Sequence, residues 1–298
     1  MIAASCKAFT HDRYTFVQIA KFEGHKNNIT HVGFHRAGKW MYTSSEDGTV
    51  KVWDMRCGLP RRPALQFAHA LRCETPLIAV HRAKKYQRDF KHPGPVNAAA
   101  LHPNQGEIIA GDTRGNVCVW DLGTAKLSTA LRPEPDVPVQ ALSIAEDNSA
   151  LAAATNSGTV YVWAPPGDAA GYTPVHQLQA HRSYVLSVKL SPDGTHMATC
   201  SADKTVKLWD AAHDFAPSGT LTGHSSWVWD ANFTVDGQYL VTASSDKTAK
   251  LWEVATCECV HTYSGHSLGL QAAALADEMS PGEGGSRGVS MASAAASE

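Results

Sequence analysis

The 298-residue chain has no long hydrophobic run. It contains no stretch of about 18 consecutive apolar residues, so the sequence predicts no membrane-spanning helix. Residues 1–11 have no extended apolar segment of the kind found in secretory signal peptides. There is no Gly-rich phosphate loop, no Walker-type lysine, no H-E-x-x-H pair and no cluster of zinc ligands. These absences exclude the enzyme classes that such motifs identify, and we expect no catalytic residue, no cofactor and no bound metal.

A strong charge of either sign is also missing. The formal net charge is −2 and the isoelectric point is about 6.7, which gives no reason to expect nucleic acid as a partner or direct insertion into a membrane. The seven cysteines are odd in number and scattered, and only Cys257 and Cys259 are close in sequence. We interpret them as reduced thiols of a cytosolic protein. The expected location is therefore cytoplasmic, with peripheral contact with endomembranes only through partners.

What the sequence does contain is an internal repeat. His181 and His224 lie 43 residues apart, and so do Trp209 and Trp252. A period in the low forties, with a His near its start and a Trp followed by an acidic residue near its end, is typical of one β-propeller blade. Short runs within each repeat alternate apolar and polar residues, as strands do, and turn residues separate them.

A His-to-Trp spacing of 28 residues extends the repeat along the chain. It links His25 to Trp53, and the same interval counted back from Trp120 and Trp163 reaches His92 and Pro135. The sequence therefore predicts an all-β WD-repeat β-propeller forming a single domain over residues 1–277. Its five complete repeats span about 25–56, 91–134, 135–180, 181–223 and 224–265.

Both ends of the predicted propeller are incomplete. Residues 1–24 resemble the later strands of a blade whose beginning is absent, and residues 266–277 open a unit that has Ala294 where the Trp is expected. Either the last strand completes the first blade, giving six blades, or about one blade of N-terminal sequence is missing from the chain. Residues 278–298 are rich in Gly, Ser and Ala, and we expect them to form a disordered tail.

A basic insertion follows the first complete repeat. The interval from Trp53 to His92 is 39 residues, whereas it is 14 or 15 in the later repeats, and the excess lies within about 57–90. This stretch and its borders are strongly basic. From Arg56 to Arg88 the basic residues are Arg56, Arg61, Arg62, Arg72, Arg82, Lys84, Lys85 and Arg88 against Glu74. We interpret the insertion as a solvated loop on the propeller rim; a docking or anionic-lipid patch and translated non-coding sequence are alternatives.

Four polar residues recur at fixed offsets in three repeats. They are His25, Thr43, Asp47 and Trp53; His181, Thr199, Asp203 and Trp209; and His224, Thr242, Asp246 and Trp252. A His, a hydroxyl and a carboxylate also make up a hydrolytic triad, but a catalytic site occurs once, whereas this set occurs three times and ends on an indole. We therefore predict a structural hydrogen-bond chain from Asp to His to Thr to Trp within each blade. Two adjacent repeats lack this network and should rely on apolar packing alone. They have His92, Ala110, Arg114 and Trp120, and Pro135, Ala153, Ser157 and Trp163.

Two tryptophans stand outside the repeat pattern. Trp227 and Trp229 flank Val228, so both should point away from the side that Val228 buries. Tyr184 occupies the place of Trp227 in the preceding repeat. Because Trp and Tyr are common at interface hot spots, we predict a partner-binding surface at these residues, with local packing as the alternative. Equivalent positions in other repeats add Asn28, Asn97 and Gln140 as further candidates.

Several strings outside the repeat consensus carry a closer resemblance. They are KNNI (26–29), VGFH (32–35), KWMYT (39–43), LHPNQ (101–105), PEP (133–135), ATCSAD (198–203) and QYLVTASSD (238–246). Over about 22–56 and 91–275 the chain resembles the small WD-repeat subunit of the TOR kinase complexes, the G-protein-β-like or "lethal with sec thirteen" family. The resemblance implies a seven-bladed propeller without catalysis of its own, which docks on the TOR kinase domain and stabilises its active site. It also implies that Trp227 is one of the family's kinase-facing aromatic residues.

The chain departs from this family in three places. Against the seven blades that the resemblance implies, we expect about one blade of N-terminal sequence to be absent; the stretch after Arg56 is inserted, and the tail from about Glu278 is unlike the family. A generic WD-repeat adaptor, such as a ubiquitin-ligase substrate receptor, is the alternative interpretation. The two are separated by whether a giant kinase or a ligase scaffold co-purifies with the chain. A propeller enzyme would need a channel cluster of carboxylates or histidines, which the candidate positions scarcely offer.

Overall fold

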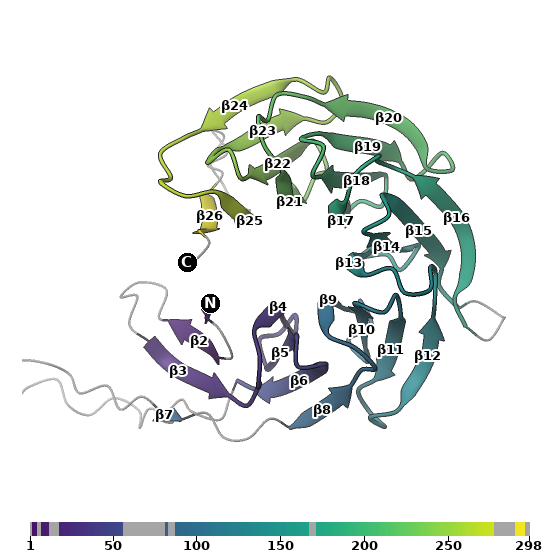
Figure 1. The fold of residues 1–298 in the computed structure, drawn as a ribbon, viewed down its shortest axis with the longest axis vertical. Helices are drawn as coiled ribbons and strands as arrows, with labels where there is room; N and C mark the ends of the chain where they lie inside the picture. The colour runs from purple at the N-terminus through teal and green to yellow at the C-terminus, as the bar shows by residue number, and fades with distance from the viewer. Residues whose placement is uncertain are drawn as a thin grey trace, which may run out of the picture. The chain divides into compact units, whose positions relative to one another are not determined.

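The computed structural model describes residues 2–4, 7–11, 18–55, 81–82, 87–166, 171–276 and 290–295. Every regular element in these ranges is a β-strand (Figure 1). The chain divides into two compact units, Met1–Val96 and Asn97–Glu298, each of which is built from small sheets. Five of the sheets are four-stranded and antiparallel throughout, which confirms the all-β WD-repeat propeller class.

The first unit holds the blade predicted from His25 and Trp53. Strands β4 (Ile29–Phe34), β5 (Trp40–Ser45) and β6 (Thr49–Asp54) come from the repeat itself, and β8 (Arg88–Lys91) completes the sheet in the order β4-β5-β6-β8. The predicted end of the insertion at residue 90 is therefore wrong. Phe90 pairs with Val50 and is buried, so these residues close the edge of β6. Residues 57–80 and 83–86 of the insertion lie outside the described residues.

A second sheet of this unit uses the first residues of the chain. Strands β1 (Ile2–Ala4), β2 (Lys7–His11) and β3 (Gln18–Glu23) are antiparallel neighbours. The two-residue strand β7 (His81–Arg82) pairs with β3 in parallel, again from within the stretch predicted as an insertion. Just inside the end of β3, Phe22 is buried against Trp53, with ring centroids 5.7 Å apart.

The second unit contains four complete blades in sequence order. In Figure 1 each blade runs from an innermost first strand to an outermost fourth strand. The strands are β9 (Val96–Leu101), β10 (Glu107–Asp112), β11 (Val117–Asp121) and β12 (Leu127–Leu131); β13 (Val139–Ile144), β14 (Leu151–Thr155), β15 (Thr159–Ala164) and β16 (Thr173–Gln179); β17 (Val185–Leu190), β18 (His196–Ser201), β19 (Val206–Asp210) and β20 (Ala216–Leu221); and β21 (Val228–Phe233), β22 (Tyr239–Ser244), β23 (Ala249–Glu253) and β24 (Cys259–Tyr263).

The unit ends in a two-stranded sheet that the sequence did not predict. Strand β25 (Leu270–Ala276) pairs in antiparallel register with β26 (Ser290–Ala295). The expectation of a disordered tail is therefore wrong for the residues of β26. Composition alone misses this strand because its partner is the open edge of β25, where unpaired backbone groups favour a further strand. Residues 278–289 and 296–298 of the expected tail lie outside the described residues.

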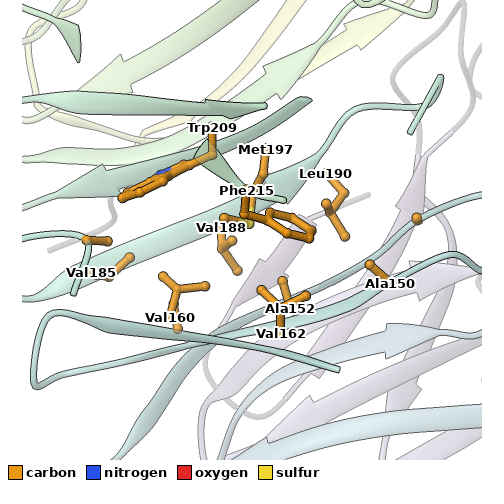
Figure 2. Packing of buried hydrophobic residues seen from close by; sticks show 13 residues of the cluster. Ala150, Ala152, Val160, Val162, Val185, Val188, Leu190, Met197, Trp209 and Phe215 are labelled. Carbon is orange, nitrogen blue, oxygen red and sulfur yellow. The ribbon is translucent and has the colours of Figure 1, made fainter. Parts of the chain in front are cut away.

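The core lies between successive blades. Figure 2 shows one such layer, in which Val160 and Val162 of β15 face Val185 and Val188 of β17. Trp209 closes the layer on the side of β19 and is 7% exposed. Full burial of an aliphatic side chain contributes about 1.5–3 kcal/mol, so each layer of this kind holds its two blades together.

Five first strands share one irregularity near their start. The register with the second strand shifts between Ile29 and His31, Val139 and Ala141, Val185 and Ser187, Val228 and Asp230, and Leu270 and Ala272. Each shift leaves one residue without a partner, as a β-bulge does. In β21 that residue is Trp229, and in β13 it is Gln140. The bulges therefore set the direction of residues at the end of the blades where the candidate surface lies.

Candidate functional site

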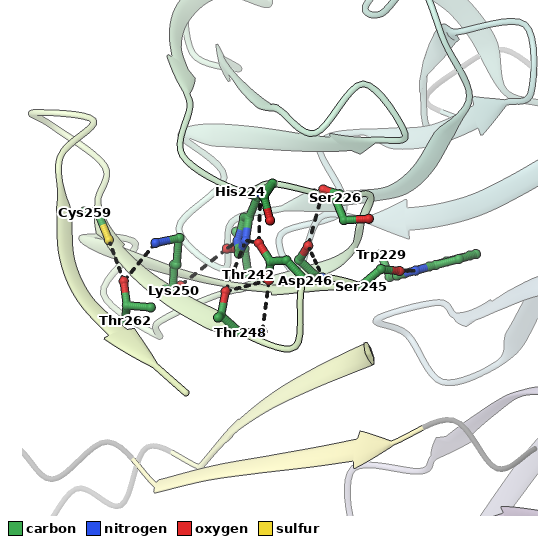
Figure 3. Close-up of polar contacts among 12 residues, drawn as sticks. His224, Ser226, Trp229, Thr242, Ser245, Asp246, Thr248, Lys250, Cys259 and Thr262 are labelled. Atoms are coloured by element: carbon green, nitrogen blue, oxygen red, sulfur yellow. Dashed lines mark hydrogen bonds and ion pairs between the residues drawn. The ribbon is translucent and has the colours of Figure 1, made fainter. Parts of the chain in front are cut away.

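The predicted polar residues meet inside their blades. In the blade of β21–β24, Trp252 Nε1 donates to Thr242 Oγ1 at 2.9 Å. His224 Nε2 lies 2.8 Å from the same hydroxyl (Figure 3). His224 Nδ1 is 2.8 Å from Asp246 Oδ2. The same contacts occur in the other two sets. The Trp209–Thr199, Thr199–His181 and His181–Asp203 contacts measure 3.1, 2.9 and 2.7 Å. The Trp53–Thr43, Thr43–His25 and His25–Asp47 contacts measure 2.8, 2.7 and 3.0 Å.

The hydrogen bonds of the Trp–Thr–His–Asp network run in one direction. The indole can only donate, and an ionised carboxylate can only accept. The Thr242 hydroxyl therefore accepts from Trp252 and donates to His224 Nε2, while His224 Nδ1–H donates to Asp246. This arrangement requires a neutral imidazole. Burial lowers the pKa of His224 below 6.5 despite the neighbouring carboxylate, and the same holds for His181 and His25.

The Asp carboxylate that ends each hydrogen-bond network is strongly stabilised in its ionised form. Burial by itself would raise the pKa of Asp246, but hydrogen bonds from Thr248, His224 and the Ser225 N–H outweigh it and lower the pKa to about 2. The pKa values of Asp203 and Asp47 are lowered by hydrogen bonds of the same kind, against the same effect of burial. Since the Thr hydroxyls are fully buried and already accept from an indole, they do not face a substrate.

The two repeats without these residues hold different polar networks. In the blade of β13–β16, Ser157 Oγ donates to Glu134 Oε2 at 2.8 Å and lies 2.8 Å from Thr155 Oγ1. In the blade of β9–β12, the buried Asp112 accepts from the backbone N–H of Arg114 and from the amide of Asn116. The expectation that these repeats rely on apolar packing alone is therefore wrong. Ser157 occupies the Asp position of its repeat, whereas Glu134 and Asp112 lie at positions that the fixed offsets did not sample.

The aromatic candidates lie at the starts of neighbouring first strands. Trp227, just before β21, is 43% exposed, and Tyr184, just before β17, is 52% exposed. Trp229 is half-buried, with its ring centroid 5.7 Å from that of Trp227 at an interplanar angle of 53°. Its Nε1 donates to Ser245 Oγ at 2.6 Å. Val228 between the two tryptophans is fully buried. The structure thus brings the two indoles together on the open side of the strand.

The three polar candidates are placed less favourably. Asn97 on β9 is half-buried and donates through Nδ2 to the carbonyl of Val139, which ties β9 to β13. Gln140 is half-buried at the bulge of β13. Asn28 is exposed in the first unit, and its carbonyl accepts from the N–H of Glu46. The aromatic residues are therefore the stronger part of the candidate surface.

Sequence reasoning missed two features of this surface. The bulge at Trp229 and the hydrogen bond to Ser245 fix the indole, and neither is visible from a spacing between tryptophans. The turns beside the aromatic residues carry Lys204 and Lys247, both exposed and both with positive φ, of 74° and 70°. The sequence indicated these two lysines through its D-K-T triplets, in which Lys stands where other repeats have a glycine in the turn.

The described residues add little in the way of reactive chemistry. Cys118 and Cys200 are buried, Cys257 is half-buried and Cys259 is exposed, all as free thiols. Burial raises the pKa of Cys118 to about 11, which disfavours the reactive thiolate. No group of three or more His, Cys, Asp or Glu in the described ranges is placed to hold a metal ion. The same ranges contain no helix long and apolar enough to cross a membrane.

Comparison with known proteins agrees with this architecture. The family "WD domain, G-beta repeat" matches residues 16–54, 84–121, 172–210 and 215–253, just over half of the chain. The "Target of rapamycin complex subunit LST8" of Saccharomyces cerevisiae is 45% identical over 261 residues, which cover 87% of this chain and 78% of that protein.

Two further relatives carry related names. The "Target of rapamycin complex subunit wat1" of Schizosaccharomyces pombe is 43% identical over 190 residues, and the LST8 subunit of Bos taurus is 37% identical over 195 residues. These alignments cover 63% and 64% of this chain, and the chain spans about half the length of each of these two relatives, 52% in both cases. The chain belongs to the WD-repeat family of the target of rapamycin complex subunits LST8 and wat1.

Proposed function

We propose that the protein is a non-catalytic subunit of a TOR kinase complex, which binds the TOR kinase domain and stabilises it in nutrient and growth signalling. The names of its relatives support membership of such a complex. The observation that carries the kinase-binding part is the exposed aromatic pair at the start of β21. Trp227 is 43% exposed, contacts Trp229 and is not needed to fill the blade core.

The geometry of this pair suits a binding site. Trp and Tyr dominate interface hot spots because they bury a large area and lose little conformational entropy. Trp229 is held by Ser245, and the blade that carries both residues is braced by the chain from Asp246 to Trp252. A partner would therefore meet a surface that is already ordered, which lowers the entropic cost of association.

The candidate surface supports a role in binding a partner and not a role in catalysis. In each of the three blades the His and Thr of the triad-like set are buried and hydrogen-bonded to each other, and the Asp is hydrogen-bonded to the His. A cytoplasmic location, with attachment to endomembranes through partners, belongs to the same proposal.

Co-purification from cells tests the proposal. Tagged protein should recover the TOR kinase, and Trp227→Ala should greatly reduce the recovery while the protein stays soluble and folded. Val260→Ala is the matched control, because Val260 is 55% exposed on β24 of the same sheet but lies on its outermost strand. Recovery of a ubiquitin-ligase scaffold in place of the kinase would contradict the proposal.

A further inference from the structure

The aromatic surface is bordered by basic side chains that the family resemblance did not single out. Arg182 precedes Tyr184 in the loop before β17, Lys204 lies in the turn between β18 and β19, and Lys247 lies in the turn between β22 and β23. All three are exposed. With Tyr184, Trp227 and Trp229 they form what we call the aromatic–basic face.

Backbone hydrogen bonds join each aromatic residue to the turn that carries a lysine. The N–H of Ala202 donates to the carbonyl of Tyr184 at 3.1 Å, and Lys204 follows two residues later. The N–H of Ser245 donates to the carbonyl of Trp227 at 3.0 Å, and Lys247 again follows two residues later. The first strands β17 and β21 are packed neighbours (Figure 1). Both pairs therefore lie at the same end of adjacent blades.

The carboxylates of these turns already accept hydrogen bonds within their own blades. Asp246 accepts from Thr248 through Oδ1 and from His224 and the Ser225 N–H through Oδ2. Asp203 likewise accepts from Thr205 through Oδ1 and from His181 through Oδ2. Arg182, Lys204 and Lys247 are more exposed than these half-buried carboxylates, which makes the face basic towards a partner.

We infer that the aromatic–basic face recognises an acidic segment of its partner that also carries an apolar side chain. This inference rests on the proposed function and specifies the chemistry of the kinase segment bound there. The apolar side chain packs on Trp227 and Tyr184, and the carboxylates pair with Arg182, Lys204 and Lys247. Rim charges of this kind raise the association rate and make the affinity sensitive to salt.

The repeats themselves supply a conservative substitution for the test. Gly115 and Gly158 occupy the positions equivalent to Lys204 and Lys247, with φ of 82° and 91°. Glycine adopts this backbone conformation without strain, so the double variant Lys204→Gly and Lys247→Gly removes two charges while keeping the turns. Lys126→Ala is the control, because Lys126 is exposed in the turn between β11 and β12, at the opposite ends of the strands from the face.

The experiment measures the dissociation constant between the full chain and the purified TOR kinase domain as a function of sodium chloride. At about 0.1 M salt the double glycine variant should bind roughly tenfold more weakly than the wild type, with little difference left near about 0.5 M. Trp227→Ala should weaken binding at both salt concentrations, and Lys126→Ala should leave both values unchanged.

Failure of the proposed function and failure of the acidic-segment inference alone give different results in this experiment. A wild-type chain that does not bind the kinase domain would overturn the proposed function and this inference with it. A wild-type chain whose binding depends on Trp227, but whose affinity and salt dependence are unchanged by the glycine substitutions, would overturn the acidic-segment inference alone.

Discussion

Replacing Thr242 by Val tests the role of the buried polar chain in the blade of β21–β24. Valine has nearly the same shape but lacks the hydroxyl that accepts from Trp252 Nε1 at 2.9 Å and lies 2.8 Å from His224 Nε2. Both of these groups would then be buried without a partner. Each unsatisfied group costs about 1–3 kcal/mol, so the substitution should lower the free energy of unfolding by about 2–6 kcal/mol.

Thr242→Ser is the matched control because it keeps the hydroxyl and removes one methyl group, at a cost of about 1 kcal/mol. Urea unfolding followed by tryptophan fluorescence gives both free energies. The reasoning predicts a midpoint for the Val variant well below that of the Ser variant. Equal midpoints would refute it, because the loss would then come from packing and not from the unpaired indole and imidazole.

Three further predictions concern stability. The pKa values of His224 and Asp246 are lower in the folded than in the unfolded protein, so the folded state binds fewer protons. The melting temperature should therefore fall as the pH drops below 6.5, and fall again towards the pKa of about 2 of Asp246. A melting temperature that is constant or rising from pH 7 to pH 5 would contradict the neutral imidazole. Ser157→Ala should cost about 1 kcal/mol in urea unfolding because it removes a donor to Glu134, and an unchanged midpoint would mean that this network does not replace the missing one. Gly158→Ala should destabilise by at least about 1–3 kcal/mol, since its φ is 91° and the new Cβ would clash with a carbonyl of the next repeat; wild-type thermal stability would show that the turn can adjust.

The spacing of His and Trp was sufficient to predict the propeller class. A period of this length, closed by an indole in five repeats, admits few other folds, and in three of the blades the residues that set the period contact one another. Local spacing worked because the contacts from Asp to His to Thr to Trp all lie within one repeat.

The features that the sequence did not predict depend on contacts between residues far apart in sequence, or on residues that differ from the repeat pattern. Strand β8 follows the insertion, and β26 begins 14 positions after the end of its partner β25, so neither carries a periodic signal. In the blade of β13–β16, Ser157 at the Asp position bonds to Glu134, a residue outside the fixed offsets. The lysines beside the aromatic surface were passed over because the repeat pattern explained the D-K-T triplet as a turn.

The most direct test of the central claim is the thermal stability of the isolated TOR kinase domain with and without this protein. A partner that binds only the folded kinase raises its melting temperature by mass action, and the rise grows with partner concentration. We predict such a rise for the wild type and a much smaller one for Trp227→Ala, whose affinity should be about thirtyfold lower if Trp227 is a hot spot. An unchanged kinase melting temperature at saturating wild-type protein, or an equal rise with both proteins, would contradict the account.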